Sequence, residues 1–248
     1  RDNPPKSGTA PDSCGNRGLS PTLLGAGPQL NLVADTFSPP WLWLANLVCL
    51  GLGAAAVRAS PWRTLGTAGR QHVFAGATVA CMVLWTITGR VGSELGFHLL
   101  GTTILTLMFG PWLAFIATLL ALAGISIARL AAWQAFGLNA ILMGALPVAV
   151  SYGVFRLADR RLPNHFFVYV LVAAFLNGAA AMTASRLGGL ALLWLGTKAP
   201  GIHSDYLVAT VLLAWAEALF TGMVMTILIV YRPGWVLLFD DARYVLNR

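Results

Sequence analysis

The feature that most constrains the fold of this chain is an uncharged run in its middle. No charged residue lies within residues 99–128, and this run is longer than the roughly 20 apolar residues that a helix needs to cross a hydrocarbon core. Gly110 and Pro111 interrupt it, and proline removes an amide donor and clashes with the preceding turn. The run therefore predicts either one kinked helix or two short helices. His98 lies where the run begins, at a position where an imidazole can face a protein-lined pocket.

The composition predicts an all-α polytopic membrane protein. Hydrophobic residues make up 57% of the 248 residues and charged residues only 10%, against about 25% charged residues in soluble domains. The mean hydropathy is +0.72, and a soluble domain of this length cannot bury that much apolar surface. The three cysteines, Cys14, Cys49 and Cys81, have no paired spacing, so they indicate neither a disulfide framework nor a zinc site.

Apolar segments separated by polar loops divide the chain. Residues 1–38 predict an irregular tail without a signal-peptide core, residues 39–232 a polytopic membrane domain, and residues 233–248 a cytoplasmic tail. The first methionine is Met82, so the printed sequence does not begin at an ordinary translation start. Residues 185–206 are apolar in part but broken by glycine, and they predict a partly buried or re-entrant connection. The predicted spans are residues 40–57, 73–88, the two halves of the central run, 140–155, 166–184 and 207–231.

The basic residues distinguish six spans from seven, because cytoplasmic loops carry an excess of Lys and Arg. If the central run crosses twice, the loops of one face carry nine arginines and those of the other face carry four basic residues. With six spans the basic loop around Arg160 changes sides and the asymmetry is lost. The sequence thus predicts about seven spans, with six as the alternative, the N-terminus outside and the C-terminus cytoplasmic. The nine arginines of the first face are Arg58, Arg63, Arg70, Arg156, Arg160, Arg161, Arg232, Arg243 and Arg248. The four basic residues of the other face are Arg90, Arg129, Arg186 and Lys198.

The first half of the central run, residues 99–109, is too short for a complete span. At 1.5 Å per residue it cannot cross about 30 Å of hydrocarbon as a helix. It must be tilted against its neighbours or begin in the preceding loop.

Four short elements follow one another in a recognisable order. The chain contains LNLVADTFSPPW at residues 30–41, a histidine followed by a glycine-containing run that ends in Gly-Pro-Trp, a Gly-Leu-Asn element, and an acidic residue in the last span. Their residues here are His98, Gly101, Gly110, Pro111, Trp112, Gly137, Leu138, Asn139 and Glu217.

This order and spacing resemble the CbiM-type membrane component of energy-coupling-factor transporters for cobalt and nickel, over residues 30–235. The resemblance implies a CbiM-type helical bundle, a transition-metal ion as the transported solute, and separate ATPase and coupling subunits as partners. It also implies His98 as a metal ligand. Family members bind the ion with a free N-terminal amine and a histidine at position two as well, whereas this chain has Asn31 there and residues ahead of Leu30. Nitrogen-rich ligand sets suit nickel and cobalt.

The candidate site residues have alternative interpretations. For His98 the alternatives are a metal ligand, a hydrogen-bonding residue in a pocket, and an interfacial histidine. Glu217 lies inside the last span, where inserting a comparable charge into the membrane costs about 2.5 to 3.5 kcal/mol. It is therefore expected to be protonated or paired within the bundle. Its role there is either structural or functional. Asn46, Asn139 and Asn177 are candidate hydrogen-bond partners, and for each of them structural cross-linking is favoured.

The sequence contains no HExxH, GxSxG or Walker A motif, so it predicts no enzyme. The leading hypothesis is a substrate-capture component of an energy-coupling-factor-type transporter, multi-pass in a bacterial-type inner membrane. The alternative is an accessory subunit of a larger membrane complex that kept the CbiM-like fold and lost metal transport. Membrane lipids are expected partners and nucleic acid is not, because the basic residues lie between apolar runs.

Overall fold

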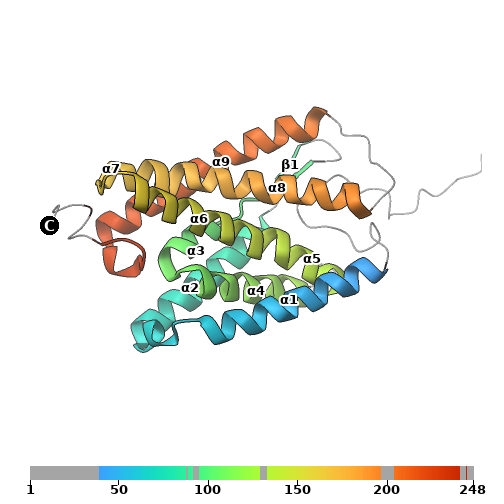
Figure 1. The fold of residues 1–248 in the computed structure, drawn as a ribbon, viewed down its shortest axis with the longest axis horizontal. Helices are drawn as coiled ribbons and strands as arrows, with labels where there is room; N and C mark the ends of the chain where they lie inside the picture. The colour runs from blue at the N-terminus through green and yellow to red at the C-terminus, as the bar shows by residue number, and fades with distance from the viewer. Residues whose placement is uncertain are drawn as a thin grey trace, which may run out of the picture.

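The computed structural model describes residues 39–87, 89–91, 95–128, 133–196, 204–240 and 244. In these residues the helices run mainly along one long axis and form a bundle (Figure 1). The helices are α1 (Pro39–Ala59), α2 (Ala68–Thr86), α3 (Thr102–Phe109), α4 (Pro111–Ile127), α5 (Phe136–Ala140), α6 (Leu146–Arg161), α7 (Phe166–Val168), α8 (Asn177–Gly196) and α9 (Ser204–Tyr231). The short elements are η3 (Trp62–Leu65), η4 (Trp133–Ala135), η5 (Ile141–Ala145), η6 (Tyr169–Leu176), η7 (Pro233–Trp235) and an antiparallel ribbon of β1 (Gly89–Val91) and β2 (Leu95–Phe97).

The all-α membrane protein expected from the sequence is confirmed. Within the described residues, four continuous helical units are long and apolar enough to cross a membrane, and α4 is a shorter apolar helix. The first and last predicted spans, residues 40–57 and 207–231, correspond closely to α1 and α9. The four units are Pro39–Ala59, Trp133–Arg161, Phe166–Leu192 and Tyr206–Tyr231.

The central run is broken where the sequence predicts. Gly110 separates α3 from α4 with φ +79°, a left-handed conformation that favours glycine. Pro111 then occupies the first turn of α4, where a missing amide donor costs nothing. The run thus forms two short helices, one of the two outcomes expected from the sequence. Whether they cross the membrane twice, as the seven-span topology requires, stays a prediction.

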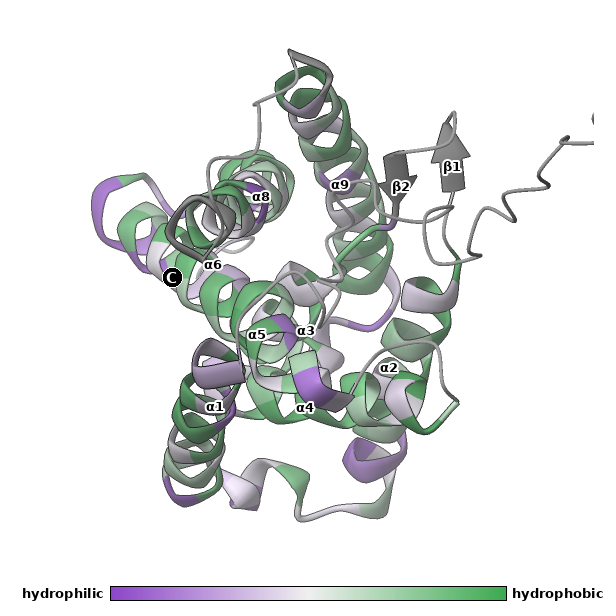
Figure 2. Cartoon of the chain, turned by 90° about the vertical axis from the view of Figure 1, so that its right-hand side faces the viewer, coloured by the Kyte–Doolittle hydropathy of each residue, from purple (hydrophilic) through white to green (hydrophobic). Residues whose placement is uncertain are grey.

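Helix α3 is too short to cross a membrane by itself. Its 8 residues extend about 12 Å at 1.5 Å per residue. Figure 1 shows α3 away from the end of the bundle at which α9 begins. The non-helical residues from His98 to Gly101 lead into α3. All residues of α3 are buried, and Figure 2 shows this helix in the middle of the bundle, with α1, α2, α8 and α9 around it.

A wide turn accommodates the proline of the next span. Trp133–Arg161 is one continuous helical unit, although Pro147 lies inside it. The π-helical segment η5, Ile141–Ala145, lies directly before α6. Proline in a helix clashes with the carbonyl four residues earlier, and π-turns are a common way to absorb such a conflict.

The prediction that residues 185–206 form a separate connection is wrong for residues 185–196 and 204–206, which are helical. Residues 197–203 lie outside the described part of the chain. Helix α8 continues through Ser185 and Arg186 to Gly196, because the polar groups at this point find partners inside the bundle. The hydroxyl of Ser185 donates to the carbonyl of Leu142 at 2.6 Å. Gly188 lets α8 approach closely, since a Cβ there would lie 2.6 Å from a methyl carbon of Leu146. Arg186 is therefore buried in a helix and does not belong to a loop, which removes it from the charge count of that face.

Helices α1 and α5 are joined by a close contact and a side-chain cap. A Cβ on Gly137 would lie 2.5 Å from the backbone of Ala45 and Asn46. The amide of Gly137 donates to Oδ1 of Asn46 at 2.7 Å, and Nδ2 of Asn46 donates to the carbonyl of Gln134 at 3.1 Å. Asn46 thus cross-links two helices, as favoured from the sequence.

We predict that Gly137→Ala destabilises the protein by about 1 to 3 kcal/mol, because the added methyl forces α1 and α5 apart. The measurement is thermal unfolding of the detergent-solubilised protein. Gly153→Ala is the matched control, since a Cβ on Gly153 of α6 meets no atom within 4 Å. Equal melting temperatures for the two variants would contradict the close contact.

Candidate functional site

The carboxylate of Glu217 binds the backbone that leads into α3. Glu217 lies midway along α9 and is fully buried. Its Oε2 accepts the amide of Leu100 and its Oε1 accepts the amide of Gly101, both at 2.8 Å. A negative group is favourable at the start of a helix because of the unpaired amides and the helix dipole. The structure thus pairs Glu217 with the backbone, where the sequence had offered asparagine side chains as its partners.

The same backbone is held from the opposite side by α2. The carbonyl of Leu100 accepts the indole N–H of Trp85 at 2.9 Å, and the thiol of Cys81 lies 3.7 Å from it. Gly101 follows with φ +66°, which a side chain would strain. Non-helical backbone is tolerated at membrane depth only where its polar groups are satisfied by protein. Residues on α2 and α9 meet this requirement for Leu100.

His98 is placed by this anchored backbone. The side chain is only 9% exposed. Its Nδ1 lies 3.4 Å from the carbonyl of Leu99, which favours the tautomer with the proton on Nδ1. The other ring nitrogen, Nε2, is buried and has no hydrogen-bond partner among the described residues. In this tautomer Nε2 carries a lone pair, which is what a metal ligand requires.

Arg186 is a buried cation on α8, with 1% of its surface exposed. Its Nε donates to the hydroxyl of Thr210 at 3.3 Å, and its guanidinium carbon lies 4.3 Å from the centre of the Tyr206 ring. The hydroxyl of Tyr206 donates to the carbonyl of Arg186 at 2.7 Å. A cation over an aromatic face is stabilised by the ring quadrupole. Two residues of α9 therefore support this charge inside the bundle.

The other predicted site residues lie elsewhere or outside the described residues. Asn31 belongs to the part of the chain that the structure does not describe. Asn139 is fully buried on α5, the helix that packs against α1, and its role in a site stays a prediction. Asn177 donates to the carbonyl and hydroxyl of Ser151 at 3.0 and 3.2 Å, so it cross-links α8 and α6.

No group of three or more His, Cys, Asp or Glu side chains that could hold a metal ion is present within the described ranges. His98, which the resemblance implies as a metal ligand, lies within these ranges. Sequence reasoning missed Trp85 and Arg186. Trp85 was missed because a tryptophan at a span end is normally an interfacial anchor. Arg186 was missed because a charged residue beside an apolar run suggests a loop, and its partners on α9 are visible only in the structure.

The fold defines a multi-pass, all-α membrane protein. The chain belongs to the CbiM family, since a family model described as the cobalt uptake substrate-specific transmembrane region matches residues 31–235. The protein is thus a membrane component of a metal-transport family. No curated protein matches the sequence significantly.

Solved structures share this fold. A crystal structure described as a transition metal transporter is 20% identical, with a TM-score of 0.64, and the match covers 80% of this chain and 92% of that one. A truncated transition metal transporter is 19% identical, with a TM-score of 0.62, covering 79% and 96% of the two chains.

We predict that Glu217→Leu strongly destabilises the protein, because it leaves the amides of Leu100 and Gly101 buried without an acceptor, at about 1 to 3 kcal/mol each. Glu217→Gln is expected to lie between this variant and the natural protein, since the amide keeps one acceptor oxygen. Yield and thermal unfolding in detergent measure the effect.

The matched control for Glu217→Leu is Thr226→Val on the same helix. The hydroxyl of Thr226 donates only within α9, to the carbonyl of Gly222 at 2.7 Å, so its loss should be nearly neutral. If Glu217→Leu and Thr226→Val have the same melting temperature, the carboxylate does not hold the α3 backbone.

Proposed function

We propose that this chain captures a transition-metal ion of the cobalt and nickel class for an energy-coupling-factor-type transporter in a bacterial-type inner membrane. The observation that carries the proposal is Nε2 of His98, which is buried and has no hydrogen-bond partner among the described residues. A buried polar atom without a partner costs free energy, so each such atom in a native protein calls for an explanation, such as a bound ion or a functional role. A bound ion would satisfy it.

The chemistry of the ligand agrees with this class of solute. Imidazole nitrogen suits nickel, cobalt and zinc, and it is a poor ligand for magnesium or calcium. One imidazole does not hold a divalent ion tightly, so the remaining ligands must be water or residues outside the described ranges. The resemblance implies that residues 30–41, with Asn31, correspond to another part of the family's metal site.

The anchored loop gives this histidine a fixed position. Leu100 and Gly101 are held by Glu217 on α9, and the Leu100 carbonyl is held by Trp85 on α2. A ligand carried by such a rigid backbone loses little conformational entropy when the ion binds. The role of Glu217 in this proposal is to position His98 and not to bind the ion.

The energy for transport would come from partners. The sequence contains no Walker A motif, and the family resemblance implies separate ATPase and coupling subunits. This chain therefore acts as a transport component without catalytic chemistry of its own.

A second candidate function is an accessory subunit that kept the fold and lost the ion. The observation that favours it is the positive charge of Arg186, which is buried in the same helical bundle as His98. A fixed positive charge opposes a bound cation. The accessory role and the transport role differ in whether the purified protein holds metal.

We predict that the protein purified from cells supplied with Co²⁺ or Ni²⁺ retains close to one ion per chain, and that His98→Ala loses it. The matched control is His165→Ala, because His165 is exposed and its ring accepts the amide of Phe167 at the start of α7. Metal analysis of the three proteins measures the effect. Equal metal content in His98→Ala and His165→Ala would overturn the assignment of His98.

The choice of partners is tested separately, by purification of the native protein in mild detergent and mass spectrometry of the proteins that accompany it. An ATPase pair with a coupling subunit is expected for transport. A stable complex without an ATPase would contradict the transporter role and support the accessory one.

A further inference from the structure

A large groove opens on the side of the bundle between α2 and α9. Its volume is about 840 Å³, and α3 and Gly101 form its floor. In Figure 2 the two wall helices lie on different sides of α3. The groove thus reaches the buried half-helix from the outer surface of the bundle.

Small residues on α2 make the groove wide. Gly76, Ala77 and Ala80 line one wall, and Val224 and Leu228 of α9 line the other. A Cβ on Gly76 would meet no atom within 4 Å. Both walls are apolar and belong to helices of the membrane domain. In a bilayer such a groove contacts hydrocarbon, and leaving it empty would forfeit dispersion contacts on every wall.

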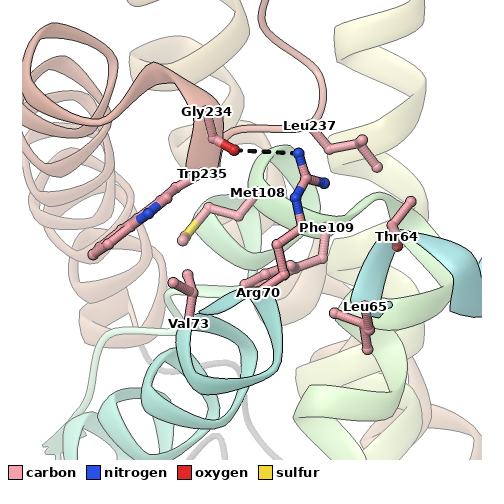
Figure 3. Close-up of a pocket in the computed structure, with 9 residues that line it drawn as sticks. All are labelled: Thr64, Leu65, Arg70, Val73, Met108, Phe109, Gly234, Trp235 and Leu237. Atoms are coloured by element: carbon pink, nitrogen blue, oxygen red, sulfur yellow. Dashed lines mark hydrogen bonds between the residues drawn. The ribbon is translucent and has the colours of Figure 1, made fainter. Parts of the chain in front are cut away.

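Two arginines lie next to one end of the groove, outside its lining. His72 and Trp235 line this end, and the guanidinium of Arg232 lies 5.8 Å from the centre of the Trp235 ring. Arg70 projects towards Gly234 above Met108 and Trp235 (Figure 3). Tryptophan at the end of a span is typical of the headgroup level of a membrane.

Arg70 is available to a ligand. Its side chain is exposed, and its Nη2 donates to the carbonyl of Gly234 at 3.4 Å, a long hydrogen bond. A guanidinium has five N–H donors, and among the described residues Gly234 supplies the acceptor that this side chain uses. The remaining donors can bind a phosphate, which arginine recognises through two parallel hydrogen bonds.

We propose that an anionic phospholipid binds in this groove, with an acyl chain between α2 and α9 and its phosphate at Arg70, next to His72 and Arg232. Basic pockets between transmembrane helices recognise acidic lipid headgroups through this combination of an apolar slot and a cationic end. The charge at the end of the groove selects a lipid over a wholly apolar helix of a partner protein.

The first test measures lipid retention by native mass spectrometry of the full chain in mild detergent. Phosphatidylglycerol and phosphatidylcholine with identical acyl chains are the probes. One phosphatidylglycerol per chain is expected, with a preference over phosphatidylcholine of about fivefold or more, since each basic residue near an acidic lipid surface contributes about that factor. Equal retention of the two lipids, or retention of neither, would overturn the proposal.

The second test fills the slot. Gly76→Phe is expected to reduce phosphatidylglycerol retention at least tenfold without changing the melting temperature in detergent, because its side chain enters open space. Gly51→Phe on the exposed face of α1 is the matched control, since a Cβ there also meets no atom. Retention by Gly76→Phe at the level of Gly51→Phe would refute the groove as the binding place. The proposal would also be refuted if the natural chain bound no lipid and Gly76→Phe instead released a bound protein segment.

The third test removes the cationic end and leaves the slot intact. Arg70→Gln is expected to lower the preference for phosphatidylglycerol about fivefold while phosphatidylcholine binding is unchanged. Arg58→Gln, at the end of α1, removes the same charge from the same loop region without touching the groove. An equal loss of preference in both variants would show that general surface charge, and not Arg70, selects the lipid.

Discussion

The bond between one carboxylate and two backbone amides is the constraint on which the centre of this protein depends. Glu217 accepts the amides of Leu100 and Gly101 at 2.8 Å, where the chain changes from an extended segment to the half-helix α3. Without an acceptor these amides would be unsatisfied at membrane depth, which lipid cannot remedy. The carboxylate in turn gains hydrogen bonds that offset its desolvation. Each group thus makes the burial of the other tolerable.

The position of His98 follows from this bond. Leu100, two residues after His98, cannot shift without breaking contacts to α9 or α2, since it is held through both its amide and its carbonyl. Gly101 and Gly110, both with positive φ, let α3 begin and end abruptly. The result is a histidine in the interior of a membrane bundle that is carried by backbone and not by a regular helix. Broken helices are a common way to build solute sites in membrane transporters.

Much of the fold could be read from the sequence because membrane helices leave strong local signals. The lengths of α1 and α9, and the break at Gly110 and Pro111, depend only on hydropathy and on backbone chemistry. The end of α8 could not be read, because the continuation of that helix past Arg186 depends on Tyr206 and Thr210, about twenty residues further along the chain. Local patterns do not contain such partners.

The polar residues at the centre of the bundle could be singled out from the sequence, but their hydrogen-bond partners could not. His98 and Glu217 are conspicuous as polar groups next to or inside apolar runs. The sequence offered side-chain amides as partners for Glu217, since it cannot show which backbone amides lack acceptors. Trp85 was not conspicuous, because its role is to donate to a backbone carbonyl and tryptophans at span ends are common. That Nε2 of His98 has no partner among the described residues is likewise visible only in the folded chain.

The two ends of α3 are completed by residues made much later in synthesis. At its start the acceptor is Glu217, 117 positions downstream of Leu100, and at its end the amides of Leu237 and Leu238 donate to the carbonyls of Met108 and Leu107 at 3.0 and 3.1 Å. Chains emerge and insert from the N-terminus, so the centre of the bundle can close only after the last helix and the segment behind it have left the ribosome. The innermost helix of the protein is therefore among the last parts to reach its final state.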